Sequence, residues 1–414
     1  PLNYGEPGSL LLLKNFDWVR QPLQSNFIQW MMKKLTRENV MSQDQNKVAS
    51  DARTAPVAVW QVLKKMSKDE LKDWRLAELD NRLSVEERNL DIGYPFGWFP
   101  MMLSNELAVC EVKPLRYFGQ ELVIWRGEDG EVRMMDAFCK HLGAHMGHGG
   151  KVYGNLLECP FHAWRYDGNE GVVKEIPYSK VIPPQVKRKC KDTWPMDEKN
   201  RMIWTWYHPQ GEEPPYEVVD LTEATDPEWS EFYECRWTIF GSIQNMAEHG
   251  VDFPHFTYIH GVASPPVAEL EFGEWDRKGI VRAKMGTPRG EVDGTITSHS
   301  NGPGQNWVRF EGICETLLLA CITPVDFDKL EVRYFYTQPK TQIEGPMAGL
   351  ARAIIKDVNK QLDQDKVVWD RMKFQPNPII CMGDGPIPKF REYYARYYAG
   401  DDGAPGRTKA AASA

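Results

Sequence analysis

The chain has 414 residues, of which 42% are hydrophobic and 12% aromatic, and its formal net charge is −8. This length allows two domains with cores of their own, and the negative charge gives no general case for binding nucleic acid or an anionic membrane surface. No run of 18 apolar residues occurs, so we expect no membrane-spanning helix. We also expect no signal peptide, and eight scattered cysteines without paired spacing favour a reducing compartment, the cytoplasm.

The first 92 residues precede the patterns that carry chemistry. Residues 1–50 contain apolar side chains at helical spacing and predict one amphipathic helix in an extension of unknown role. Residues 51–92 predict short helices, because Ser67 and Ser84 are each followed three residues later by glutamate, as in a capping box.

A β-rich domain is predicted over residues 93–207, where short apolar runs are separated by Gly and Asp. The clearest of these runs, residues 122–138, predicts a hairpin with a Glu-Asp-Gly turn. Residues 208–218 are rich in Pro and Gly and predict a linker to the next domain.

The second domain is predicted over residues 208–400, followed by a disordered tail over 401–414. It contains a helix-like stretch near 240–260, then β-runs, and then a helical stretch over roughly 347–373. A small β-domain followed by strands and helices indicates an α+β fold.

Four metal-binding side chains occur in two short clips of the first domain, Cys139-x-His141 and Cys159-x-x-His162. Each clip pairs one thiolate with one imidazole, so each can give its sulfur to one iron and its imidazole to another. That is the ligand set of a Rieske [2Fe–2S] cluster. A structural zinc site uses the same residue types, but zinc clips usually pair like with like, which favours the cluster.

A second candidate metal site lies in the second domain. His255 and His260 are five residues apart, which on a regular helix is about 140°, so only an irregular or ending helix could aim both at one point. Asp363 and Asp365 offer a carboxylate, and two imidazoles with one carboxylate form the facial triad of non-haem Fe(II) oxygenases. Taken alone, the pattern is more typical of two ordinary histidines. A Rieske cluster moves one electron at a time and needs a second redox centre, which favours iron.

The segment from YPFGWFPMM to IPYS, which includes both clips, resembles the Rieske domain of the Rieske non-haem iron oxygenases. Asp252, His255 and His260 match the D-x2-H-x4-H motif of that family one by one, and Asp365 matches its Gln-Asp-x-x-x-Trp run. The resemblance implies that His255, His260 and Asp365 hold Fe(II), and it leaves Asp363 as a solvated helix residue. It also implies that Asp252 bridges a cluster histidine of one subunit to an iron histidine of the next.

His249 departs from the family pattern, because many relatives read Glu-Asn where this chain reads Glu248-His249. One hypothesis is that His249 is a hydrogen-bonding residue beside the iron ligands. The other is that it is a catalytic residue, either as an extra, reversible iron ligand or as a pocket residue that contacts substrate. The sequence leaves both open.

The resemblance also implies the architecture and the partners. A small all-β Rieske domain would be followed by a helix-grip catalytic domain of the START or Bet v 1 kind, to which the N-terminal helices belong. A flavin and iron–sulfur reductase fed by NAD(P)H, with or without a ferredoxin, would pass electrons singly to the cluster and then to the iron, where O2 is activated. Because the two centres of one chain face apart in this family, we expect a head-to-tail homotrimer.

The segment MGDGPIPKFREYYARYY at 382–398 is most similar to the ketosteroid 9α-hydroxylase and sterol 7-desaturase group. This similarity implies a monooxygenase that hydroxylates a small, apolar, fused-ring substrate. Three alternatives stay open: an O-demethylase or hydroxylase of a smaller aromatic compound, a Rieske-type electron carrier, and a zinc-stabilised binding module. A carrier would end near residue 200, and a binding module of this kind would contain zinc and no iron.

Overall fold

The computed structural model describes residues 83–85, 87–88, 92–261, 267–287, 290–312, 314–345 and 348–400. The helix predicted in residues 1–50, the capping box predicted at Ser67 and the predicted C-terminal tail lie outside the described residues. The capping box at Ser84 is confirmed. The Ser84 N–H donates to the Glu87 carboxylate (2.8 Å), and the Glu87 N–H donates to the Ser84 hydroxyl (3.1 Å).

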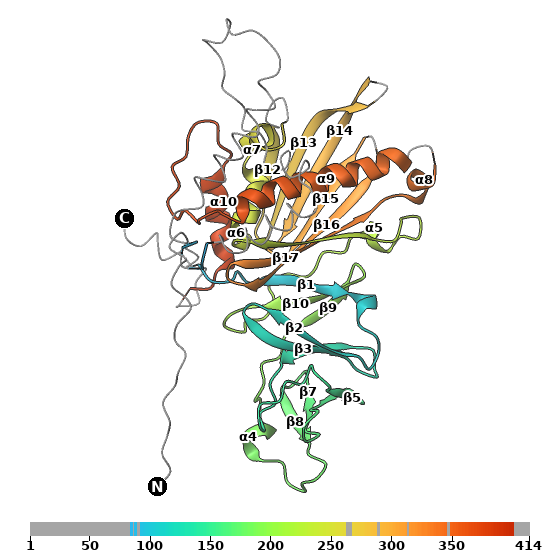
Figure 1. Cartoon of the computed structure of the whole chain (residues 1–414), viewed down its shortest axis with the longest axis vertical. Helices are drawn as coiled ribbons and strands as arrows, with labels where there is room; N and C mark the ends of the chain where they lie inside the picture. The colour runs from blue at the N-terminus through green and yellow to red at the C-terminus, as the bar shows by residue number, and fades with distance from the viewer. Residues whose placement is uncertain are drawn as a thin grey trace, which may run out of the picture. The chain divides into compact units, whose positions relative to one another are not determined.

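Three small antiparallel sheets form the first part of the described chain (Figure 1). The first sheet has the spatial order β1 (Gly97–Leu103), β10 (Met202–Tyr207) and β9 (Met196–Lys199). The second has the order β2 (Val112–Tyr117), β3 (Gln120–Arg126) and β4 (Val132–Asp136). The third has the order β5 (Lys151–Tyr153), β6 (Leu156–Glu158), β7 (Arg165–Asp167) and β8 (Val172–Glu175). The hairpin predicted over residues 122–138 is confirmed as β3 and β4, which pair from Leu122 with Asp136 to Arg126 with Val132. The short helices here are η1 (Ser104–Glu106) and α4 (Pro184–Lys187).

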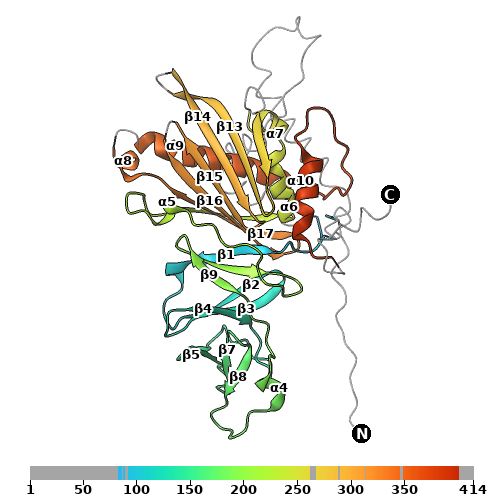
Figure 2. The same ribbon diagram turned by 180° about the vertical axis from the view of Figure 1, so that it is seen from behind.

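A seven-stranded antiparallel sheet dominates the second part. Its spatial order is β11 (Tyr233–Phe240), β17 (Lys329–Thr337), β16 (Thr316–Asp326), β15 (Gln305–Glu311), β14 (Gly290–Asn301), β13 (Asp276–Thr287) and β12 (Ala268–Phe272). The helices are α5 (Thr222–Thr225), α6 (Ile243–Glu248), η2 (His249–Val251), α7 (Pro254–Tyr258), α8 (Lys340–Ile343), α9 (Ala348–Trp369), α10 (Ile387–Tyr394) and η3 (Ala395–Tyr397). Helix α9 lies across one face of this sheet in both views (Figures 1 and 2). The arrangement confirms the predicted α+β class.

Helix α9 includes one of the predicted site residues, Asp365, on its buried side. Its 22 residues contain no proline, and Ala351, Leu362, Asp365 and Trp369 recur on one buried side, at spacings close to whole helical turns. Asp363 falls off this stripe and is exposed. No helix in the described part of the chain is long and apolar enough to cross a membrane.

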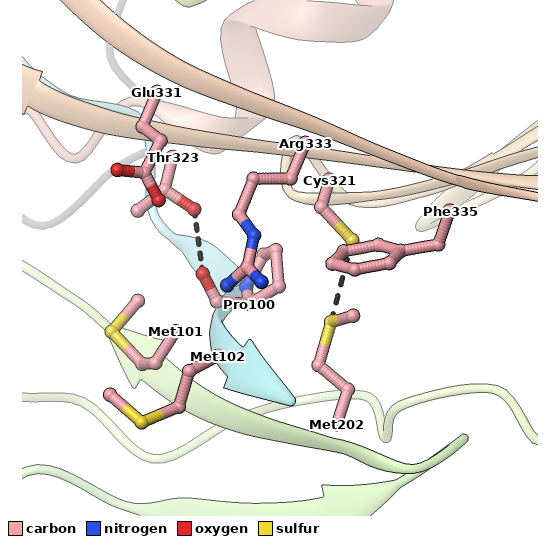
Figure 3. A pocket seen from close by; sticks show the side chains of 9 residues that line it. All are labelled: Pro100, Met101, Met102, Met202, Cys321, Thr323, Glu331, Arg333 and Phe335. Atoms are coloured by element: carbon pink, nitrogen blue, oxygen red, sulfur yellow. Dashed lines mark hydrogen bonds between the residues drawn. The ribbon is translucent and has the colours of Figure 1, made fainter. Parts of the chain in front are cut away.

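The β1 sheet and the large sheet share a continuous core, in which residues of β1, β3 and β10 pack with residues of β16, β17 and α9. The Thr323 hydroxyl donates to the Pro100 carbonyl (2.8 Å), and Arg333 donates to Glu106 (2.8 Å). Figure 3 shows a small hollow at this junction, lined by three methionines, Cys321 and Arg333 among others. It borders none of the predicted metal-binding residues, so it is a feature of packing between the two parts. The β5–β8 sheet contributes to a separate core.

Candidate metal centres

The two predicted cluster clips lie in matching turns. In each clip the cysteine N–H donates to the carbonyl five residues later (2.9 Å), and the cysteine carbonyl accepts the N–H four residues later (3.0 Å). The residues four positions after the cysteines, Gly143 and Ala163, have φ values of +78° and +54°. This left-handed conformation closes each turn tightly, at some cost for the alanine. The clips are therefore two copies of one backbone motif.

The thiols of the clips face inward and the imidazoles face outward. Cys139 and Cys159 are buried, whereas His141 and His162 are partly exposed, with ring centroids 4.6 Å apart. Contact with Cys159 lowers the pKa of Cys139 to about 5, which favours a thiolate. The Nδ1 atom of His141 is buried and has no hydrogen-bond partner. Buried thiols and an orphaned imidazole nitrogen fit residues that hold a [2Fe–2S] cluster.

Tyr166 serves the cluster site and was not predicted from the sequence. Its hydroxyl accepts the Lys140 N–H (3.0 Å) and lies 3.1 Å from the Cys139 sulfur. Because the N–H occupies one acceptor position, the hydroxyl proton can point at the sulfur. Trp164 stacks on His141 at 4.6 Å, nearly parallel, and so orients that ring. Tyr166 lies on β7, where it pairs with Leu157 of β6, and it is 27 residues along the chain from Cys139.

The second candidate site brings four predicted residues to one point. His249, His255, His260 and Asp365 each offer one ligand atom, and these atoms all lie within 4.8 Å of one another. The Nε2 atoms of His249 and His260 are 3.2 and 3.3 Å from the Asp365 Oδ1. Asp363 lies apart from this group, and its carboxylate accepts the indole N–H of a tryptophan on β11 (2.8 Å).

A broken helix explains how histidines five residues apart converge. Helix α7 begins at Pro254 and ends at Tyr258, so His255 lies inside it and His260 lies beyond its end. Gly261 follows with φ +76° and turns the chain out of the helix. The two imidazole centroids are 5.1 Å apart, with the rings nearly perpendicular. The segment predicted near 240–260 is thus helical, but in three short pieces.

Gln364, the residue before Asp365, fixes the tautomer of His260. The His260 Nδ1 lies 3.0 Å from the Gln364 Oε1. An amide oxygen only accepts hydrogen bonds, so Nδ1 carries the proton and the lone pair of Nε2 stays free for a metal. Burial lowers the pKa of His260, which favours the neutral ring that metal binding requires. This role of Gln364 was not predicted from the sequence.

Asp252 lies at the edge of the site with one side open. Its Oδ2 is 3.6 Å from the His255 Nδ1, and 38% of its side chain is exposed. The nearby imidazole of His255 lowers the pKa of the Asp252 carboxyl, so the group is a carboxylate at neutral pH. One face of the carboxylate thus meets an imidazole of the site, and the other can meet a second partner.

The donor set fits a divalent iron. The Oδ1 of Asp365 is buried and has no hydrogen-bond partner, although the His260 Nε2 is 3.3 Å away. Atoms that each bind one metal at about 2.1 Å and at right angles lie about 3.0 Å apart. The observed separation of 3.3 Å is close to this ligand–ligand distance. A set of imidazoles with one carboxylate suits non-haem iron.

Two family models match the chain in succession. Residues 97–186 match the Rieske [2Fe-2S] domain, and residues 205–398 match the 3-ketosteroid 9alpha-hydroxylase C-terminal domain. The chain belongs to the Rieske non-haem iron oxygenases. The predicted family, enzyme class and pair of cofactors, a Rieske [2Fe–2S] cluster and a mononuclear iron, are confirmed.

Relatives of this Rieske oxygenase include two kinds of enzyme that are named for steroids. The cholesterol 7-desaturase nvd of Hemicentrotus pulcherrimus is 28% identical over 338 residues, which cover 74% of this chain and 70% of the relative. A 3-ketosteroid-9-alpha-monooxygenase, oxygenase component, of Rhodococcus rhodochrous is 28% identical over 337 residues, which cover 75% and 82%.

Solved structures share the fold of this Rieske oxygenase. NdmA of Pseudomonas putida CBB5 with caffeine matches at a TM-score of 0.60 and 19% identity, covering 79% of this chain and 95% of that one. Dicamba monooxygenase bound to 3,6-dichlorosalicylic acid matches at 0.59 and 17%, covering 75% and 97%. These likenesses confirm the predicted architecture, a Rieske domain followed by a catalytic domain.

Proposed function

We propose that this Rieske oxygenase is the terminal oxygenase component of a multicomponent monooxygenase. One atom of O2 enters a substrate C–H bond and the other leaves as water, with two electrons and two protons supplied from outside the chain. The observation that carries the proposal is the convergence of His255, His260 and Asp365 in the domain that matches 3-ketosteroid 9alpha-hydroxylase. A plain electron carrier needs no such second site.

Two groups of residues would hold the cofactors. The cluster ligands are Cys139, His141, Cys159 and His162, and the iron ligands are His255, His260 and Asp365. When bound, the two cofactors supply one-electron transfer and the binding and activation of O2. Around the iron ligands, Gln364 holds the proton on the Nδ1 of His260, and Trp369 packs beside the ring of His249.

Asp252 is the proposed bridge between the two centres, across a subunit boundary. Its open side supports this role, because a carboxylate can accept from the His255 ring and from a cluster imidazole together. The cluster imidazoles are flanked by Leu142 and Phe161, which are 65% and 60% exposed, and such apolar side chains suit a protein contact. A head-to-tail homotrimer would join each cluster to the Asp252 of a neighbour and close the ring.

Electrons come from a separate reductase in this proposal. The Rhodococcus relative is named an oxygenase component, which supports a partner that carries the reducing chemistry. We expect a flavin and iron–sulfur reductase fed by NAD(P)H, with or without a ferredoxin, and a cytoplasmic location where NAD(P)H is available.

The proposed substrate is an apolar, fused-ring compound of the steroid kind. The relatives named above act on 3-ketosteroids and cholesterol. Val308 and Phe310 on β15 and Tyr334 on β17 pack toward α9 yet stay partly exposed, which supports an apolar binding surface between sheet and helix. The alternative, a smaller aromatic substrate, has the support of fold likeness alone.

Arg277 on β13 offers this surface a polar anchor. It pairs with Ser300, which pairs in turn with Asn306, so Arg277 shares the sheet face of Val308. Arg277 is 6% exposed, donates to the Gly250 carbonyl (3.2 Å) and forms no ion pair with any described residue. A buried guanidinium with donors left over suits an acceptor oxygen on the substrate, such as a ketone or carboxylate.

The test is a substrate screen with a surrogate reductase under 18O2. A 3-ketosteroid, cholesterol and an aromatic ether are compared by product mass spectrometry, and we expect one 18O atom in a steroid product. The purified protein should contain about three irons and two acid-labile sulfides per chain. Turnover of the aromatic ether alone would overturn the substrate class, and a colourless protein holding only zinc would overturn the enzyme.

A further inference from the structure

His249 lies as close to the carboxylate of Asp365 as His260, a proposed iron ligand, does. It is the first residue of η2, and its Nε2 lies 3.2 Å from the Asp365 Oδ1, against 3.3 Å for the Nε2 of His260. Its ring centroid is 3.6 Å from that of His255. Trp369 packs edge-on against the ring at 4.7 Å and limits its rotation. Four ligand atoms from these residues therefore surround one point.

The contact between His249 and Asp365 is not a hydrogen bond. Both the His249 Nε2 and the Asp365 Oδ1 are buried, and neither has a hydrogen-bond partner despite the 3.2 Å between them. A buried polar atom left unpaired costs about 1–3 kcal/mol, so two such atoms side by side need an explanation. A metal ion bound by the His249 Nε2 and the Asp365 Oδ1 would give each atom a partner. It would also explain why the two atoms lie close together without the geometry of a hydrogen bond.

We infer that His249 is a fourth protein ligand of the mononuclear iron, bound through Nε2, in a site of three imidazoles and one carboxylate. This inference rests on the proposed function, because it takes His255, His260 and Asp365 as the other ligands. In a six-coordinate site, four protein ligands leave two positions for exogenous ligands, where three leave three. The residue after His249 is Gly250, whose carbonyl accepts a hydrogen bond from Arg277, so the fourth ligand is adjacent in the chain to a contact of the proposed substrate anchor.

The experiment counts imidazoles at the mononuclear site in the full-length protein. Cobalt(II) replaces the mononuclear iron, the cluster is kept oxidised and EPR-silent, and pulsed EPR with 15N-labelled histidine reports the directly bound nitrogens. We expect three bound imidazoles in the native protein and two in His249→Asn. The cobalt dissociation constant should rise on the order of 10- to 100-fold in that variant. His299→Asn, which removes a histidine stacked on Trp307, is the matched control and should keep three.

The outcomes separate this inference from the function on which it rests. Two bound imidazoles in the native protein would overturn the inference and leave the proposed oxygenase intact, with His249 as a neighbour of Asp365. No metal at His255, His260 and Asp365 would overturn both. The native count decides the question even if His249→Asn does not fold. Where the variant folds, three imidazoles in both proteins would also overturn the inference.

Discussion

Replacing Tyr166 with phenylalanine removes one hydroxyl from the cluster site and little else. That hydroxyl lies 3.1 Å from the Cys139 sulfur and accepts the Lys140 N–H (3.0 Å). The ring of Tyr166 is fully buried in the core beneath the clips, so a phenylalanine ring can occupy the same space. We expect Tyr166→Phe to fold, to bind the cluster and to lower its reduction potential.

The magnitude follows from the charge on the cluster. A hydrogen bond to a charged group contributes about 1.5–3 kcal/mol, and a donor to sulfur stabilises the more negative, reduced cluster more than the oxidised one. If the difference between the two states is about 1 kcal/mol, the potential falls by roughly 40 mV, because 59 mV corresponds to 1.4 kcal/mol for one electron.

A dye-mediated redox titration, followed by EPR of the reduced cluster, measures the shift. Tyr178→Phe is the matched control, since the Tyr178 hydroxyl accepts the Trp164 indole N–H (2.7 Å) and is exposed. Its potential should equal that of the native protein. An unchanged or raised potential in Tyr166→Phe, with full cluster content, would refute the assignment of the hydroxyl as a donor to sulfur.

Four further variants test the catalytic domain. Asp365→Asn should lose the mononuclear iron and keep the cluster spectrum, whereas Asp363→Asn should keep both. Equal iron contents in these two variants would contradict the choice of Asp365 over Asp363 as the iron ligand. Asp252→Asn should retain both metals and slow single turnover from a pre-reduced cluster by at least about 10-fold, because it removes the charge that holds both rings; a native rate would exclude the bridge. Arg277→Met should raise KM for a 3-ketosteroid by roughly 10- to 100-fold, the worth of a charged hydrogen bond, and should spare an analogue without the oxygen. Equal losses on both compounds would show that Arg277 only supports the fold.

The parts of the structure that the sequence could predict depend on local patterns. The clip spacing indicated the cluster residues, and the stripe of α9 distinguishes buried Asp365 from exposed Asp363. The hairpin of β3 and β4 followed from two short apolar runs around one Gly-containing turn. Each of these signals lies within a single helix, hairpin or turn, where the period of the apolar side chains and the turn residues determine the local structure.

The parts that could not be predicted depend on pairing between distant segments. Tyr166 on β7 contacts Cys139, which is 27 residues earlier in the chain, and Arg277 is placed on the proposed substrate face by its pairing with β14. No residue type or spacing marks either position, since register is set by the whole sheet. The shared backbone conformation of the two clips could not be predicted either, because the left-handed position is a glycine, Gly143, in one clip and an alanine, Ala163, in the other.

The bend between η2 and α7 is what brings the residues of the proposed iron site together. On a single regular helix, His249 and His260 would be about 16 Å apart along the axis, too far to share a metal. Asp252 instead has extended backbone angles, φ −90° and ψ 98°, and Pro254 begins a new helix two residues later. The chain folds back there, so all three histidines of the segment meet Asp365. The residue at this break is also the one whose carboxylate contacts His255, so the same backbone conformation that assembles the proposed iron ligands leaves the proposed bridge at the open edge of the site.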